Sequence, residues 1–213
     1  MIKSEVTACG LITRAAELKK TEKGETFIMF SMKLDLKGRD GSTYPLYISV
    51  TADGGESDII QYKQGKKVTV LGNLHFRKKG DKLYFNLRAD GGVELSDSGK
   101  EEKIEGKMEF KGKIGSKGVG SHLDKKNRTY KTFSAFSQSK DGENSEFLWF
   151  RFMFFNPKAE DVAILAAGKY VDIVGDLQLS SYNSKLSLDC RVSSVKEWVL
   201  KSNNKGQESE ENN

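Results

Sequence analysis

Apolar residues occupy every second position through much of this chain, and glycines interrupt the alternation at short intervals. Since successive side chains of a β-strand point to opposite faces, a period of two predicts strands that bury one face. The predicted strands are 4–12, 26–36, 43–51, 67–76 and 82–90, followed by 107–114, 130–138, 146–155, 170–180 and 184–193. The pattern therefore predicts an all-β fold.

Two helical segments interrupt the strands, one after the third strand of each half. The clearer one is NPKAEDVAILAAG (156–168), where Asn156 suits the N-cap, Pro157 the first turn and Gly168 the C-terminal stop. SDIIQYKQG (57–65) takes the same place in the first half and is shorter. Both are expected to be short helices that connect strands.

The sequence repeats itself with an offset of about 103 residues. QGKKVTVLGNL (64–74) aligns with AGKYVDIVGDL (167–177) at that offset. Near the start of each half, VTACGLI (6–12) resembles MEFKGKI (108–114) at an offset of 102. A shared offset over widely spaced segments indicates two copies of one unit of roughly 100 residues.

Each copy has five predicted strands with its helix between the third and the fourth, which is the layout of the OB-fold. We therefore expect two tandem five-stranded OB-fold barrels. The expected division is a first domain at 1–97, a polar linker at 98–106, a second domain at 107–200 and a disordered polar and acidic tail at 201–213. The alternative is that the polar segment is a long loop within one large domain.

Composition narrows the class of partner. Hydrophobic residues make up 37% and charged residues 31% of 213, and the net charge of +5 favours anionic partners. Without an uncharged apolar window of 18 residues or the apolar core of a signal peptide, we expect a cytoplasmic protein with no membrane partner. Cys9 and Cys190 lie in separate strand-like runs and are expected to be two reduced, half-buried thiols rather than a disulfide.

Catalytic patterns are missing from the sequence. It has no Ser-His-Asp order, no His-x-x-x-His or Cys-x-x-Cys spacing and no tight carboxylate cluster. His75 and His122, the two histidines, have no apparent catalytic partners in the sequence. We expect no catalytic residue, no cofactor and no metal site, and therefore no enzyme.

The most apolar segment, SEFLWFRFMFF (145–155), contains Arg151. A charge placed in the core without a partner would cost several kcal/mol. Strand alternation instead predicts an inward face of Phe150, Phe152 and Phe154, and an outward face of Trp149, Arg151, Met153 and Phe155. Aromatic rings beside a cation suit a flexible polyanion that carries flat bases. The alternative is that this face packs on the sister domain or another subunit, where Arg151 meets a carboxylate.

Three motifs, in order and spacing, resemble the bacterial single-stranded DNA-binding protein family. TEKGETFIMFSM (21–32) resembles its second strand, KQGKKVTVLGNLHFRK (63–78) resembles its fourth strand, and FLWFRF (147–152) resembles its Trp-His-Arg-Val segment, with Phe150 where histidine is usual. The resemblance implies an OB-fold whose strand face and hairpins hold single-stranded DNA. Because that family usually assembles four OB units, two units in one chain imply a homodimer.

The resemblance also implies DNA-binding residues. Trp149, Arg151, Phe155 and Tyr182 match binding positions of the family, and Leu46, Ile48 and Ala52 are expected to stand in the first copy where Trp149, Arg151 and Phe155 stand in the second. The second copy is accordingly expected to carry the aromatic stacking, and the first more of the basic contacts. The acidic tail lacks the apolar tip with which the family recruits replication proteins.

Further candidates lie in basic loops. Arg77, Lys78 and Lys79 form a hairpin tip beside Phe76 and Tyr84. The glycine-rich segment 112–131 carries Lys117, Lys125, Lys126 and Arg128. Either group contacts phosphates or is simply a solvated turn.

Taken with the resemblance, these residues predict a protein that binds single-stranded DNA with little sequence preference, in replication, recombination or repair. Proteins of replication or recombination are further candidate partners. One alternative is an OB-fold adaptor that uses the same face for protein–protein contact, which the apolar exposed face expected in the first copy (Leu46, Ile48 and Ala52) favours. The other alternative is an RNA-binding protein.

Overall fold

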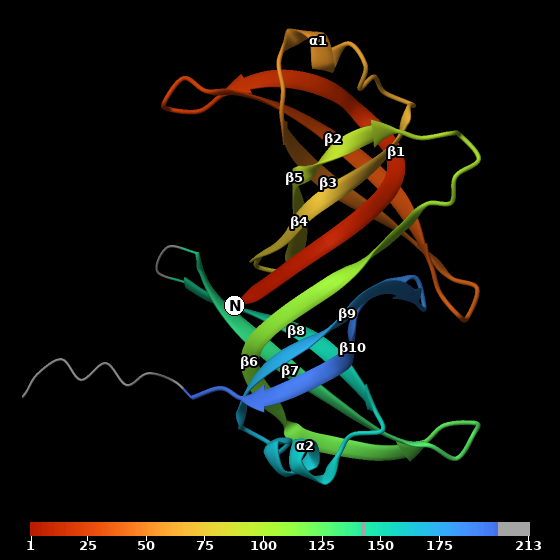
Figure 1. The fold of residues 1–213 in the computed structure, drawn as a ribbon, viewed down its shortest axis with the longest axis vertical. Helices are drawn as coiled ribbons and strands as arrows, with labels where there is room; N and C mark the ends of the chain where they lie inside the picture. The colour runs from red at the N-terminus through yellow and green to blue at the C-terminus, as the bar shows by residue number, and fades with distance from the viewer. Residues whose placement is uncertain (142–143, 200–213) are drawn as a thin grey trace, which may run out of the picture.

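The structure of the protein, a computed structural model, describes residues 1–141 and 144–199 (Figure 1). The tail expected at 201–213 lies outside the described residues. The first half contains β1 (Ile2–Lys20), β2 (Thr26–Lys37), β3 (Thr43–Asp53), α1 (Glu56–Ile59), β4 (Lys67–Lys79) and β5 (Lys82–Leu95). The second half contains β6 (Lys103–Leu123), β7 (Thr129–Asp141), β8 (Asn144–Phe155), α2 (Ala159–Ile164), β9 (Tyr170–Tyr182) and β10 (Lys185–Glu197). The expected all-β class is confirmed.

Strand pairing closes a five-stranded ring in each half. In the first ring β1 pairs with β2, β2 with β3, β3 with β5, β5 with β4, and β4 with β1. The second ring repeats this order with β6 to β10. One pair in each ring is parallel, β3 with β5 and β8 with β10, and the others are antiparallel. This order, with a short helix between the third and fourth strands, fits an OB-like fold.

The two rings are joined edge to edge by β1 and β6. These strands pair antiparallel from Ile2 opposite Phe110 to Cys9 opposite Lys103, and they lie side by side at the centre of the molecule (Figure 1). β1 can serve both rings because bulges after Ile12 bend it, so that its first half pairs with β4 and β6 and its second half with β2.

The start of β6 corrects the expected linker. Residues 103–106, which the composition assigned to the linker at 98–106, are part of β6. Pairing with β1 satisfies backbone groups that a bare strand edge would leave open. Gly106 permits the close approach, because a Cβ there would lie 2.0 Å from the carbonyl oxygen of Glu5.

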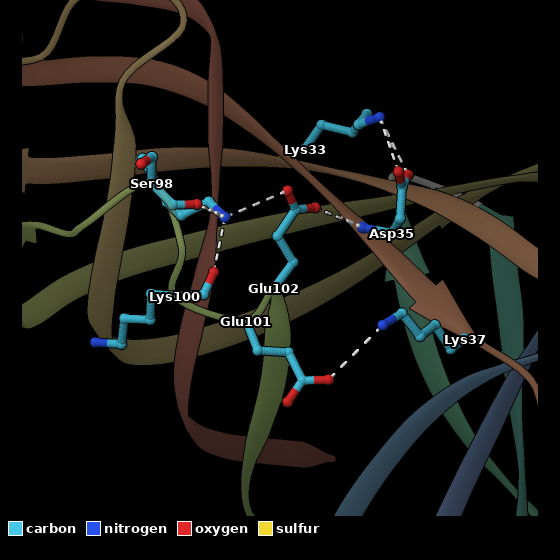
Figure 2. A network of polar contacts seen from close by, with 8 residues as sticks. Lys33, Asp35, Lys37, Ser98, Lys100, Glu101 and Glu102 are labelled. Atoms are coloured by element: carbon cyan, nitrogen blue, oxygen red, sulfur yellow. Dashed lines mark hydrogen bonds and ion pairs between the residues drawn. The ribbon is translucent and has the colours of Figure 1, made fainter.

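The segment before β6 is anchored to the first ring by a polar network (Figure 2). The Nζ of Lys67 donates to the carbonyl oxygens of Lys100 at 2.7 Å and Ser98 at 2.9 Å, and lies 3.9 Å from the carboxylate of Glu102. Glu102 in turn accepts the backbone N–H of Asp35 at 3.1 Å. The connection between the rings is therefore held in place rather than hanging free.

Both helices are shorter than expected, and α2 also begins later. α2 covers Ala159–Ile164 instead of 156–168, so its N-cap is Lys158 and not Asn156, whose φ of 49° is left-handed. The carboxylate of Asp161 accepts the N–H of Lys158 at 2.9 Å, so the first turn is capped from within the helix. α1 covers Glu56–Ile59 instead of 57–65, with Asp58 accepting the N–H of Gly55 at 2.8 Å.

Hairpins of each ring also contact the other ring. The carboxylate of Asp40 accepts the backbone N–H of Asn183 at 2.8 Å, and the hydroxyls of Ser42 and Ser181 lie 2.7 Å apart. In the reciprocal contact, the N–H of Gly80 donates to Glu146 at 3.1 Å. The first contact places the β9–β10 hairpin on the connection between β2 and β3, and the second places the β4–β5 hairpin on the start of β8.

Candidate nucleic-acid interface

The face of β8 is arranged as strand alternation predicts. Phe150, Phe152 and Phe154 are buried in the core. Trp149 on the opposite face is 48% exposed, and its ring packs against Phe136 with the ring centroids 4.8 Å apart. Exposed aromatic area with a fixed orientation is what base stacking requires.

Arg151 does meet a carboxylate, but within its own ring. Its Nε lies 2.6 Å from Oδ1 of Asp189, a nearly buried residue on the neighbouring strand β10. The hydroxyl of Ser187 donates to the other oxygen of Asp189 at 2.8 Å. The hydrogen bond to Asp189 raises the pKa of Arg151. The Arg151 side chain stays 58% exposed, so the pair leaves part of a cation on the surface.

A stack of side chains runs outward from the end of β8. The ring of Phe155 stacks on Tyr130 at 5.1 Å and 22°, and Tyr130 stacks on His122 at 5.1 Å and 28°. The guanidinium of Arg191 lies over the ring of Phe155, 5.2 Å from its centroid. Neither Tyr130 nor Arg191 was expected from the sequence as a binding residue.

The stack borders a hollow of about 550 Å³ that we call the basic hollow. Five cations line it: Arg39, Lys125, Lys126, Arg128 and Arg191. Arg39 comes from the connection between β2 and β3, so the first ring contributes to a hollow built mainly by the second. Such a concentration of positive charge attracts phosphate groups.

One carboxylate organises the hairpin that carries three of these cations. Asp124 accepts the backbone N–H groups of Arg128 at 2.9 Å and Lys126 at 2.8 Å, and its other oxygen accepts Nε of Arg128 at 2.7 Å. Backbone and side-chain bonds from Arg128 lower the pKa of Asp124. Lys125, Lys126 and Arg128, all sequence candidates, thus lie in the basic hollow, whereas Lys117 is exposed on β6 and does not line it.

The expected alignment of the two third strands, with Leu46, Ile48 and Ala52 opposite Trp149, Arg151 and Phe155, is wrong by one residue. Val50 pairs with Phe30 and Leu87, while Phe152 pairs with Phe133 and Cys190. The third strands therefore align at an offset of 102, which makes Tyr47 the counterpart of Trp149. Since a shift of one residue exchanges the faces of a strand, Leu46, Ile48 and Ala52 are buried core residues and not an exposed apolar face.

The outer face of the first ring has a hollow of its own, of about 430 Å³, which we call the tyrosine hollow. Tyr47 and Tyr84 line it and are 60% and 45% exposed. Its polar lining residues are Thr13, Arg14, Ser31, Ser49 and Asn86. Tyr84 was a sequence candidate, whereas Tyr47 was missed although its alternation with Leu46 and Ile48 places it outside.

The remaining candidates lie in hairpins. Lys78 lies 3.9 Å from the carboxylate of Glu146, so the tip with Arg77 and Lys79 sits at the contact between the rings. Tyr182 is 65% exposed at the turn of β9 and β10, next to the hydrogen bond between Asn183 and Asp40. The structure does not bring these hairpin residues into either hollow.

Other kinds of site find no support in the described part of the chain. Within residues 1–141 and 144–199, no three His, Cys, Asp or Glu side chains gather as metal ligands would. None of the helices found there has the length and apolar character to cross a membrane. Cys9 and Cys190 are free and buried, and burial raises the pKa of the Cys190 thiol to about 12.

No protein-family model and no curated protein matches this sequence. Similar solved structures include the wild-type single-stranded DNA-binding protein of Thermus aquaticus, with 14% identity, a TM-score of 0.47 and coverage of 95% of this chain and 96% of that one. A small single-stranded DNA-binding protein of Streptomyces coelicolor matches with 13% identity and a TM-score of 0.36, covering 45% and 92%. The single-stranded DNA-binding protein of Plasmodium falciparum, in complex with single-stranded DNA, matches with 17% identity and a TM-score of 0.35, covering 44% and 95%.

Proposed function

We propose that this protein binds single-stranded DNA and performs no chemistry on it. The observation that carries the proposal is the basic hollow. Five cations line this hollow, and one of them, Arg191, lies over Phe155 in the stack of three aromatic rings. A flexible strand offers alternating phosphates and flat bases, so it satisfies cations and rings together. The single strand reported in complex with the Plasmodium falciparum relative is consistent with this choice.

In this proposal each part of the surface has one task. The cations of the basic hollow neutralise phosphates, and Trp149 and Tyr182 stack on bases, each contributing about 1–3 kcal/mol. Phe155, whose ring already contacts Tyr130 and Arg191, lines the hollow and holds these two side chains in place. Arg151 is held by Asp189 and presents its remaining donors to the backbone of the strand. Tyr47 and Tyr84 give the first ring its own stacking surface, so both rings take part.

The wider expectations belong to the same proposal. The rings act as two domains, the first at 1–97 and the second from the start of β6 at Lys103, and two chains assemble into four binding units. The role lies in replication, recombination or repair. The adaptor alternative is weakened, because the exposed apolar face that favoured it, with Leu46, Ile48 and Ala52, is buried in the core.

Tryptophan fluorescence tests the proposal. Trp149 is exposed on the proposed surface, so its emission should fall when a base stacks on it. We expect quenching with oligo(dT), weaker effects with oligo(rU) and little effect with a duplex. Trp149→Phe should remove the signal and keep binding, which is then followed by anisotropy of labelled oligo(dT). Equal affinity for the duplex, or no binding to any of the three, would contradict the proposal.

A further inference from the structure

The tyrosine hollow lies where the first ring lacks a pair of charges that the second ring has. Sheet register places Ser31, Ser49 and Asn86 in one row across β2, β3 and β5. The equivalent row of the second ring is Ser134, Arg151 and Asp189, across β7, β8 and β10. Ser49 and Asn86 therefore stand where the bonded pair of Arg151 and Asp189 stands. These two side chains are smaller than the ion pair and carry no charge, and both line the tyrosine hollow.

The polar side chains in this row are available to a ligand. Across residues 1–141 and 144–199, the side chains of Ser31, Ser49 and Asn86 make no hydrogen bond to another residue. The two hydroxyls each donate and accept, and the amide of Asn86 offers a donor and an acceptor side by side. The row thus presents an uncharged hydrogen-bonding edge among the residues that line the hollow.

The walls of the hollow suit a flat ring rather than a phosphate. Tyr47 and Tyr84 border the row with exposed aromatic rings, and Arg14 is the one cation among the residues that line it. The basic hollow of the second ring has five cations by comparison. The volume of about 430 Å³ lies within the range of small-ligand sites.

We propose that the tyrosine hollow binds one nucleobase of the single strand by its edge, and that Asn86 and Ser49 thereby give binding a base preference that resides in the first ring. This inference rests on the proposed function and goes beyond it, since stacking and phosphate contacts alone discriminate little between bases. In single strands the Watson–Crick edge is free to be read by hydrogen bonds. Adjacent donor and acceptor groups on such an edge match the amide of Asn86.

Competition between homopolymers tests this inference with the full chain. Labelled oligo(dT) is displaced by unlabelled oligo(dT), oligo(dA) or oligo(dC) of equal length. A base that leaves the amide of Asn86 without a partner should bind about 5- to 150-fold more weakly than one that satisfies it. In Asn86→Ala the ratio of affinities between the preferred and the disfavoured homopolymer should fall several-fold. Gln61→Ala, which removes an exposed amide outside both hollows, should leave this affinity ratio unchanged.

A double variant introduces the ion pair of the second ring at the equivalent positions of the first. Ser49→Arg with Asn86→Asp should form the ion pair seen between Arg151 and Asp189 and fill the hollow. The variant should still bind, but with equal affinity for the different homopolymers. If the variants misfold, NMR of the unaltered protein provides the test. The signal of the Asn86 side-chain amide should shift when the preferred homopolymer is added. Equal affinities for all homopolymers, a ratio unchanged in Asn86→Ala, or an unmoved amide signal would each overturn the inference and leave the proposed function standing. Failure of every homopolymer to bind would overturn both.

Discussion

The Nε of Arg151 lies 2.6 Å from Oδ1 of Asp189, across the parallel contact between β8 and β10. This bond explains why an arginine occurs within the most apolar segment of the chain. Asp189 is almost completely buried, and a buried carboxylate needs a cation and further hydrogen bonds. Arg151 and Ser187 supply them from the rim of the core.

Removing Arg151 should therefore destabilise the fold as well as weaken DNA binding. Arg151→Ala leaves Asp189 with one hydrogen-bond donor, and we expect a loss of about 1–3 kcal/mol in the free energy of unfolding. Urea denaturation measures it. Adding Asp189→Asn to Arg151→Ala should restore part of the stability, since a neutral amide needs no cation. If the double variant recovers none of the lost free energy of unfolding, then Arg151 does not stabilise the fold by compensating the charge of Asp189.

Trp149→Ala should weaken binding far more than it weakens the fold. The indole is about half exposed, so its loss opens no core cavity, and one lost stacked base corresponds to about 1–3 kcal/mol, or roughly 5- to 150-fold in affinity. Anisotropy of labelled oligo(dT) measures the affinity, and thermal melting measures the fold. Phe152→Ala is the control, because this fully buried ring should cost about 3–5 kcal/mol of stability. Unfolding of Trp149→Ala with normal binding by the folded fraction would show that this face is an interface.

Acid should loosen the contact between the two rings. Hydrogen bonds from the hydroxyl of Ser42, and then from the backbone N–H groups of Asn183 and Ser42, lower the pKa of Asp40 from 3.8 to about 2. Because the pKa is lowered in the folded state, this contribution is fully present above pH 4 and is lost as the pH falls towards 2. Hydrogen exchange of the Asn183 amide should accelerate in that window relative to neighbouring exposed amides. Asp40→Asn should abolish the pH dependence, and an unchanged profile in that variant would contradict the assignment.

Lys67 should matter more than its neighbours in the polar network. Its side chain is 10% exposed and donates to two carbonyl oxygens of the connecting segment (Figure 2). Lys67→Met leaves those acceptors and Glu102 without their donor, so we expect a loss of about 1–3 kcal/mol in urea denaturation. Lys37→Met is the matched control, since its pair with Glu101 is exposed and should change stability by less than about 0.5 kcal/mol. Equal effects of the two substitutions would refute this distinction.

The sequence was most informative where a feature depends on local alternation. The inward phenylalanines of β8 and the outward Trp149 follow from a period of two, as the buried and exposed positions confirm. The same rule applied to TYPLYISV would have placed Tyr47 outside and Leu46 inside. The error arose because the offset of the repeat was carried unchanged into β3, where it differs by one residue.

Features that depend on contacts between distant residues could not be predicted in this way. The pairing of β1 with β6, the entry of Arg39 into the basic hollow, and the bond from Asp40 to Asn183 all join the two rings. Nothing local in the sequence distinguishes Arg39 from an ordinary cation in a solvated loop. The stack of His122, Tyr130 and Phe155 likewise requires the register of β6, β7 and β8 to be known.

The salt dependence of oligo(dT) binding tests the central claim most directly. Each phosphate neutralised on a single strand contributes about −0.7 to the slope of log K against log salt concentration, so the five cations of the basic hollow predict a slope of about −3 to −4. Arg39→Ala should make the slope shallower by about 0.7, whereas Lys158→Ala, which removes an exposed cation outside both hollows, should not change it. A slope near zero, or a slope unaffected by Arg39→Ala, would contradict the assignment of the basic hollow as the site where this protein holds single-stranded DNA.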